Sequence, residues 1–297
     1  MEQYSGDTCP ACGAQVSSAD NTCEKCGREA PSGRDHLEID LGALAGVSDL
    51  GRRHASNEDA MGLGLTETPT GTAAMAVVCD GVSTSTRPAE ASLAAAQAAI
   101  RVLTDMLRDG MRAAEALPKA VRAADAAVRE LAGESLNAPA ATIVSAVVTA
   151  DAVVVAWIGD SRAYWLPADH DLGNQLLTRD DSLAIELAAA GALPEADAIT
   201  SPHAHIVTRW LGADAQAGEP HSAAFQPPGP GVLLLCTDGL WNYQPEADGL
   251  ARLAGPKSPG DLAGAAADLL AFALEAGGHD NITIVLIAYP PRANGGA

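Results

Sequence analysis

Apolar runs rich in valine and isoleucine recur along the chain and predict β-strands, because β-branched side chains pack well on a pleated surface. Thr142–Thr149 and Ala152–Ile158 are separated by a two-residue gap, which predicts a hairpin. Asp151 lies in that gap and interrupts the longest apolar stretch, so no transmembrane helix is expected. Further strands are expected at Glu38–Val47, Ala60–Leu65, Thr72–Cys79, Ala163–Leu166, Gly231–Cys236 and Asn281–Ala288.

Helical segments separate the groups of strands. A long alanine-rich region begins at Pro88, a residue that favours the first turn of a helix. It predicts helices over Ala91–Leu107 and Pro118–Leu131, with a break at Gly110. Two shorter helices are expected at Leu183–Ala190 and Asp261–Glu275. Because helices and strands do not alternate regularly, the pattern favours an α+β fold in which helices cover antiparallel sheets.

The composition is that of a folded, acidic protein. Of its 297 residues, 47% are hydrophobic, which is ample for a buried core and excludes general disorder. The formal charge of −20 makes binding to nucleic acid or to an anionic membrane unfavourable at long range. The first residues form neither a basic nor an apolar signal region, so we expect a cytoplasmic location.

Two cysteine pairs near the N-terminus have the spacing of a zinc site. Cys9 and Cys12 form one pair, Cys23 and Cys26 form the other, and a glycine follows each. Four thiolates complete a closed tetrahedral site and leave no position for a catalytic water. Two disulfides are the alternative, disfavoured by the reducing cytosol. We therefore expect one structural Zn²⁺ in a zinc ribbon at residues 1–30, a module typical of adaptors for proteins or nucleic acids.

The rest of the chain is expected to form one further domain. Residues 31–37 are polar, contain Pro and Gly, and predict a linker. No fixed-period repeat follows, which favours a single domain over residues 38–290. Residues 291–297 predict a flexible tail.

Acidic residues recur at the ends of the predicted strands. An Asp followed by Gly is an ordinary turn former, so any single example is weak evidence. Several together indicate more, because strand ends of one sheet lie close together and ionised carboxylates at close range repel one another. A cation would relieve that repulsion. The recurring residues are Asp59, Asp80, Asp160, Asp238 and Asp280.

Oxygen ligands without interleaved Cys or His favour hard cations such as Mg²⁺ or Mn²⁺. A supply of carboxylates beyond the needs of one ion indicates two ions that share a bridging group. Paired ions about 3.5–4 Å apart generate a hydroxide and stabilise in-line displacement at phosphorus. The pattern therefore predicts hydrolysis of a phosphate ester.

From Ile39 to Tyr289 the chain resembles the type 2C metal-dependent serine/threonine protein phosphatases, bacterial type. The motifs occur in the family's order: Arg53-His54-Ala55-Ser56-Asn57-Glu58-Asp59-Ala60, Cys79-Asp80-Gly81, Ile158-Gly159-Asp160-Ser161-Arg162-Ala163-Tyr164, His205-Ile206-Val207-Thr208-Arg209-Trp210-Leu211-Gly212, Cys236-Thr237-Asp238-Gly239-Leu240-Trp241 and Gly277-Gly278-His279-Asp280-Asn281-Ile282-Thr283. The resemblance implies two antiparallel β-sheets packed as a sandwich and flanked by helix pairs, with metals in a cleft at one edge.

The resemblance also implies roles for individual residues. Glu58 would act on the metals through water, and the Gly81 carbonyl would be a further ligand. Asp160 would hold a third, weaker metal together with Asp238; its alternative role is a strand-end cap. Asn281 would orient Asp280 by hydrogen bonding. The direct ligands of the two core metals would be Asp59, Asp80, Asp238 and Asp280.

Three departures from the family pattern affect these assignments. Val82 stands where some eukaryotic members place a histidine proposed to protonate the leaving group, so no general acid is assigned. The segment Thr178-Arg179-Asp180-Asp181-Ser182 replaces Thr-x-Asp-His-Ser at the start of the flap that shapes substrate access. The phosphate-binding arginine aligns with His54, one position after Arg53. We favour Arg53, because a guanidinium offers two parallel donors at every working pH.

Other reactive residues have simpler interpretations. His203 and His205 could form a metal pair on a strand, but flap or surface histidines are favoured. Cys79 and Cys236 are expected to be small buried hydrophobic residues.

Taken together, the expectation is metal-dependent hydrolysis of phosphoserine and phosphothreonine in proteins by a hydroxide bridging two Mg²⁺ or Mn²⁺ ions. The substrate would be a phosphorylated protein of a serine/threonine kinase pathway, and the zinc ribbon would bind a protein partner. The alternative is a catalytically silent phosphatase-like scaffold or a zinc-ribbon adaptor in signalling. Retention of all four core aspartates argues against a silent scaffold, since a scaffold gains nothing from mutually repelling carboxylates.

Overall fold

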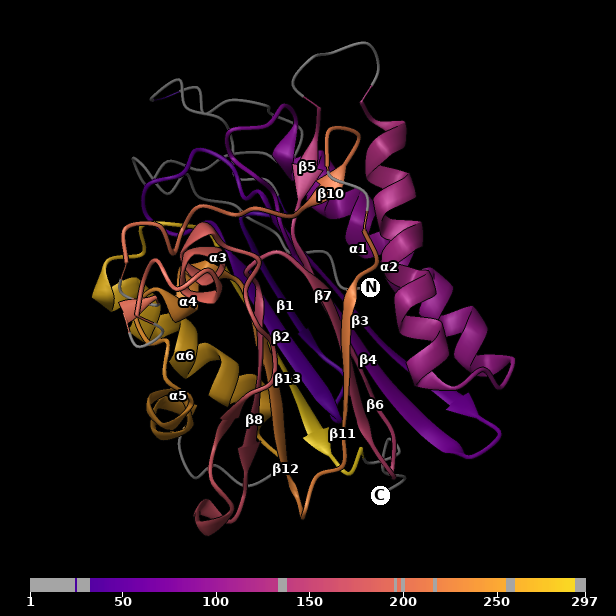
Figure 1. The fold of residues 1–297 in the computed structure, drawn as a ribbon. Helices are drawn as coiled ribbons and strands as arrows, with labels where there is room; N and C mark the ends of the chain where they lie inside the picture. The colour runs from indigo at the N-terminus through magenta and orange to yellow at the C-terminus, as the bar shows by residue number, and fades with distance from the viewer. Residues whose placement is uncertain are drawn as a thin grey trace.

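The computed structural model describes residues 25, 33–132, 138–194, 197–198, 201–215, 218–254 and 260–291. Two antiparallel sheets lie face to face, and helices cover the outer face of each (Figure 1). The predicted order of layers, helices, sheet, sheet, helices, is therefore confirmed. The cysteines of the predicted zinc ribbon lie outside the described residues.

One sheet has five strands in the order β11-β7-β6-β4-β3 and the other has six in the order β1-β2-β13-β12-β8-β9. The five-stranded sheet consists of β3 (Asp59–Thr68), β4 (Gly71–Asp80), β6 (Ile143–Val148), β7 (Val153–Ile158) and β11 (His221–Phe225). The six-stranded sheet consists of β1 (His36–Asp40), β2 (Leu44–Asp49), β8 (Arg162–Pro167), β9 (Gln175–Leu176), β12 (Gly231–Cys236) and β13 (Ile282–Tyr289). A separate short pair joins β5 (Ala140–Ala141) to β10 (Leu211–Gly212).

Each sheet has its own helices. The long helices α1 (Pro88–Arg108) and α2 (Ala113–Glu130) pack on the five-stranded sheet. The six-stranded sheet is covered by α4 (Asp238–Trp241), α5 (Ala247–Ala254) and α6 (Leu262–Ala276). The remaining helical elements are α3 (Leu183–Ala189) and the 3₁₀ turn η1 (His170–Leu172).

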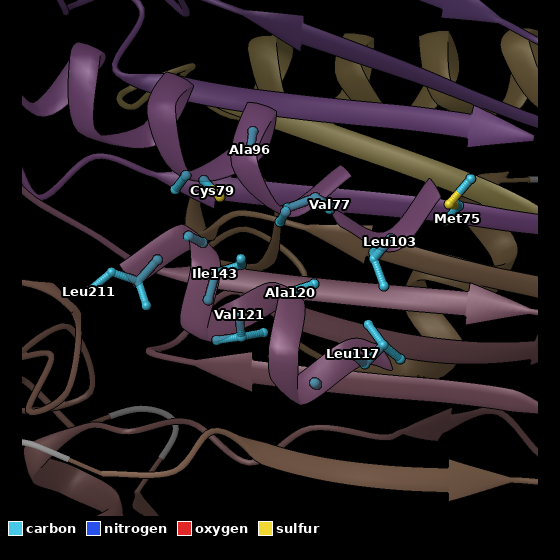
Figure 2. Packing of buried hydrophobic residues seen from close by; sticks show 14 of the residues in the cluster. Met75, Val77, Cys79, Ala96, Leu103, Leu117, Ala120, Val121, Ile143 and Leu211 are labelled. Atoms are coloured by element: carbon cyan, nitrogen blue, oxygen red, sulfur yellow. The ribbon is translucent and has the colours of Figure 1, made fainter. Parts of the chain in front are cut away.

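Alanine allows α1 and α2 to pack closely on the five-stranded sheet. Ala96 of α1 and Ala120 of α2 are buried in the same cluster as Met75 and Val77 of β4 (Figure 2). Contact with β3 is equally close, because a Cβ on Gly62 would lie 3.1 Å from Cβ of Ile100. A second apolar layer fills the space between the two sheets, and a third lies under α4, α5 and α6.

The hydrophobic pattern predicted the central strands well and some boundaries poorly. Gly231–Cys236 is a strand exactly as expected, whereas Glu38–Val47 is two strands, β1 and β2, instead of one. Gly42 has a positive φ of 75° and its amide binds the Asp40 carboxylate, so the chain turns there. Pro118 lies inside α2 rather than at its start, because the helix begins at Ala113. The short, half-exposed β11 was not predicted.

The predicted linker is also shorter than expected at its C-terminal end. His36 and Leu37 belong to β1, and the Arg34 guanidinium donates to the backbone oxygens of Ala89 (2.8 Å) and Asp59 (2.9 Å). Asn57 in turn donates to the carbonyl of Arg34 at 2.8 Å. Side-chain hydrogen bonds to distant segments, which a local polar pattern does not reveal, tie these residues to the domain.

Candidate metal centre

Strand pairing places the predicted aspartates at one edge of the sandwich. Asp59 and Asp80 are direct partners in the register of β3 and β4. Asp238 follows β12 and Asp280 precedes β13, and these two strands are antiparallel neighbours in the other sheet. The Thr237 amide donates to the Thr283 carbonyl at 3.1 Å and extends that pairing up to the aspartates. Residues more than 200 positions apart therefore meet where both sheets end.

Burial and mutual repulsion raise the pKa of four carboxyls at this edge, those of Asp59, Asp80, Asp160 and Asp238. The pKa of Asp59 is raised to about 8, first by burial and then by the charges of Asp280 and Asp238, against hydrogen bonds from Thr283 and Thr237. Burial raises the pKa of Asp238 to about 7. Burial also raises the pKa of Asp80 and of Asp160 well above the ordinary aspartate value. Without a cation the ionised cluster is unfavourable, because buried negative charges repel at short range.

Three aspartates at this edge, Asp59, Asp238 and Asp280, have protein partners. Asp59 accepts from the Thr237 hydroxyl at 2.9 Å, and Asp238 accepts from the Asn242 amide at 3.1 Å. His54 Nε2 lies 3.2 Å from Asp280 Oδ1. Within the ranges that the structure describes, no three acidic, histidine or cysteine side chains are arranged so that they could already hold a metal ion.

The donor set nevertheless fits a hard divalent cation. It consists of carboxylates on rigid strand ends, and their charges would be stabilised by a cation between them. The backbone positions of these residues are fixed by the pairing of the strands in the two sheets.

A cavity of about 480 Å³ opens beside the carboxylates. Asp80, Asp160, Asp238 and Asp280 line one part of it. The segment Gly81–Ser85 and the flap residues His205, Ile206, Val207, Trp210 and Asp214 line the remainder, with Ala140 and Thr142. Asp59 does not line the cavity and is only 2% exposed, so it lies beneath the other carboxylates.

Close packing explains the glycine in two of the Asp-Gly pairs at this edge, Asp80-Gly81 and Asp238-Gly239. A Cβ on Gly81 would overlap the carbonyl oxygens of Pro88 and Glu58, and a Cβ on Gly239 would overlap the carbonyl oxygen of Asn281. Neither glycine has a positive φ. Both are therefore required by close backbone approach, and not by the turn conformation that Asp-Gly usually indicates.

The other predicted site residues surround the carboxylates. The Glu58 carboxylate accepts from the Ser83 hydroxyl at 2.6 Å. Asn281 holds Asp280 through its backbone amide at 2.8 Å, whereas its side chain binds the amide of Glu58 and the carbonyl of Leu50. The hydrogen bond expected between Asn281 and Asp280 is present, and its donor is the backbone amide of Asn281. Arg53 is exposed and does not line the cavity.

Sequence reasoning missed a buried network behind the site. The Arg162 guanidinium donates to the Asp180 carboxylate at 2.7 and 3.0 Å and lies 3.7 Å from the ring centroid of Trp241. Trp241 belongs to the helix that Asp238 begins, and His205 stacks on its ring with centroids 6.0 Å apart. The network therefore connects Asp180, near the predicted start of the flap, to the helix that carries Asp238, a candidate metal ligand. The second aspartate of Asp180-Asp181, which departs from the family motif, binds the Gly159 amide at 3.0 Å.

The fold and the site together define an α+β protein with a cluster of buried aspartates where two sheet edges meet. Residues 50–254 match the family model described as protein phosphatase 2C, and the chain belongs to this family. It is 37% identical over 153 residues to a serine/threonine phosphatase of Listeria innocua, a match covering 51% of this chain and 58% of that protein. It thus spans less than two thirds of the length of that relative.

Solved structures of serine/threonine phosphatases are also similar to this chain, over a larger share of its residues. Serine/threonine phosphatase Stp1 from Staphylococcus aureus is 25% identical with a TM-score of 0.69, covering 85% of this chain and 97% of that one. The catalytic domain of the phosphatase PstP, solved in complex with two manganese ions, is 25% identical with a TM-score of 0.65, covering 82% of this chain and 97% of that one. Among the described helices, none has the length and apolar character needed to cross a membrane.

Proposed function

We propose that this chain is a metal-dependent phosphatase that removes phosphate from phosphoserine and phosphothreonine in proteins. The observation that carries the proposal is the meeting of four aspartates from two sheets, three of which line a cavity. The family assignment and the serine/threonine phosphatases among the relatives support it.

In this proposal Asp59, Asp80, Asp238 and Asp280 hold two Mg²⁺ or Mn²⁺ ions, with the carbonyl of Gly81. When bound, the ions supply a nucleophilic water and neutralise charge on the phosphoryl oxygens. Glu58 acts through water, and Asp160 contributes with Asp238 to a third, weaker site. The protein's own contribution is to fix these oxygens on strand ends and to admit the phosphoresidue into the cavity.

Arg53 and His54 have separate roles in the proposal. His54 touches Asp280, so it is placed to orient that carboxylate. Arg53 is exposed on the adjacent turn, where a long guanidinium side chain can reach a phosphate at the cavity mouth. Arg53 therefore binds phosphate and His54 positions a ligand.

The decisive experiment measures hydrolysis of p-nitrophenyl phosphate and of a phosphothreonine peptide with Mn²⁺ and with EDTA. Asp80→Asn or Asp238→Asn is expected to lower kcat by at least about a thousandfold, because the metals are lost or misplaced. Asp151→Asn, on the exposed hairpin turn, is the matched control and should retain full activity. Full activity in EDTA would contradict the proposal, and inactivity under all metal conditions would favour the silent scaffold.

A further inference from the structure

The cavity has a second part whose chemistry differs from that of the aspartate edge. Four residues that line it have large apolar side chains, and we call them the apolar wall: Val82, Ile206, Val207 and Trp210. Ile206 is 46% exposed, so its side chain is accessible to a ligand. Asp214 lies at this wall and accepts from the Trp210 indole at 3.0 Å. No lysine or arginine is among the described residues that line the cavity.

The backbone holds this wall beside the aspartates. Gly81 pairs with Ala141 in an isolated bridge, and Ala141 pairs with Leu211, the residue after Trp210. The Gly212 amide then donates to the Asp125 carboxylate of α2 at 3.0 Å. The segment that carries Trp210 and Asp214 is therefore fixed to the chain segment that follows Asp80.

We propose that this wall is a subsite for a basic side chain of the substrate, lysine or arginine, close in sequence to the phosphoresidue. The proposal rests on the proposed function and names the class of phosphoprotein that the site accepts. The aliphatic stem packs against Ile206 and the Trp210 ring, and the cationic group lies near the ring face and the Asp214 carboxylate.

Charge complementarity selects this occupant over the alternatives. An acidic neighbour would meet Asp214 without a compensating cation and would also approach a molecule of net charge −20. A purely apolar neighbour would pack against the apolar wall but would form no ion pair with the Asp214 carboxylate. A basic side chain can contact both the apolar wall and the carboxylate, because it combines an apolar stem with a positively charged end.

The test uses peptides that contain the phosphonate analogue of phosphothreonine, which cannot be hydrolysed. Four peptides differ only at one flanking position, which carries Arg, Leu, Ala or Glu, and the position is moved through three residues on either side. With the full chain and Mn²⁺, we expect the Arg peptide at one position to bind roughly tenfold more tightly than the Glu peptide, with a difference that shrinks at high salt.

Variants of the wall sharpen the test. Asp214→Lys should reverse the order of the Arg and Glu peptides, and Trp210→Ala should reduce the advantage of Arg over Ala. Asp151→Asn, on the far hairpin turn, should leave the order unchanged. The subsite would be overturned by any of three results. The Arg and Glu peptides could bind equally at every position, the Leu peptide could bind as tightly as the Arg peptide, or Asp214→Lys could leave the order of affinities unaltered. Because binding is measured without turnover, a failure of Mn²⁺-dependent hydrolysis would count against the proposed function alone.

Discussion

At the scale of single residues, Asp59 shows how burying a carboxylate without a metal ion reduces the stability of the folded protein. Its pKa of about 8 in the fold lies above the ordinary aspartate value, so the native state binds more protons than the unfolded state between these values. The contribution of Asp59 to the stability of the metal-free protein should therefore fall as pH rises from about 4 toward 8.

Asp59→Asn removes that charge, and its amide oxygen can still accept from Thr237. We expect the metal-free variant to melt a few degrees above the metal-free wild type at pH 8, with the difference vanishing near pH 4. Thermal unfolding in EDTA across this range measures it. Saturating Mn²⁺ should raise the melting temperature of the wild type more than that of the variant. If the variant were no more stable than the wild type at pH 8, the ionised Asp59 carboxylate would not be destabilising the metal-free fold.

Arg53 and His54 are distinguished by kinetics across pH. Arg53→Ala should raise KM for phosphopeptides by roughly tenfold or more at every pH, since a guanidinium stays charged. His54→Ala should mainly lower kcat and weaken Mn²⁺ activation, because His54 touches a candidate ligand. Arg52→Ala, an exposed neighbour, is the control. An unchanged KM in Arg53→Ala with a large increase in His54→Ala would reverse the two roles.

At the scale of elements, Gly239 couples the start of α4 to the start of β13. Its missing Cβ leaves room for the Asn281 carbonyl, and a methyl group there would force the two backbones apart. Gly239→Ala should cost about 1–3 kcal/mol of unfolding free energy and weaken Mn²⁺ activation, because Asp238 and Asp280 would separate. Gly260→Ala has open space around it and should be neutral in the same urea titrations.

The hairpin of β1 and β2 carries a pH-dependent contact outside the site. Burial opposes ionisation of His36, but hydrogen bonds to Asp49 (2.7 Å) and Glu38 (3.0 Å) outweigh it and raise the pKa of the imidazole. A raised pKa means that the contact stabilises the fold below the unfolded-state pKa of about 6.5 and is lost as pH rises through the folded-state pKa.

His36→Gln should therefore reduce stability at pH 5.5 and have little effect at pH 8.5, as measured by urea unfolding. His203→Gln, an exposed histidine, provides the matched control. An equal loss at both pH values would mean that packing, and not charge, is what His36 contributes.

At the scale of the whole molecule, the two predicted metal chemistries should be separable. Four thiolates at Cys9, Cys12, Cys23 and Cys26 favour zinc, whereas the aspartate edge favours hard ions. We expect one zinc per chain to persist while Mn²⁺ is exchanged, as measured by metal analysis after gel filtration. A Cys9→Ser, Cys12→Ser variant should lose that zinc and keep Mn²⁺-dependent hydrolysis of small substrates.

Deletion of residues 1–30 should leave the remaining domain folded and active on p-nitrophenyl phosphate. The cut must precede Arg34, which hydrogen-bonds the backbone of Asp59 and Ala89. An unfolded truncated chain would mean that the zinc ribbon is part of the domain's core.

The sequence alone determined the central strands, the main helices and the positions of the aspartates. Local rules suffice for these features: β-branched runs form strands, alanine-rich runs with proline and glycine boundaries form helices, and polar residues follow at strand ends. Motif order along the chain was enough to indicate the family, which the comparisons confirm.

Only the tertiary structure decided which distant groups meet and what surrounds them. The clash that requires Gly239 involves a backbone oxygen more than 40 positions away, and the partner of Arg162 is a flap aspartate. The wall formed by Ile206 and Trp210 likewise depends on the pairing of Leu211 with Ala141. Local propensity carries no information about such contacts, because they are fixed by the packing of elements against one another and not by the residues on either side.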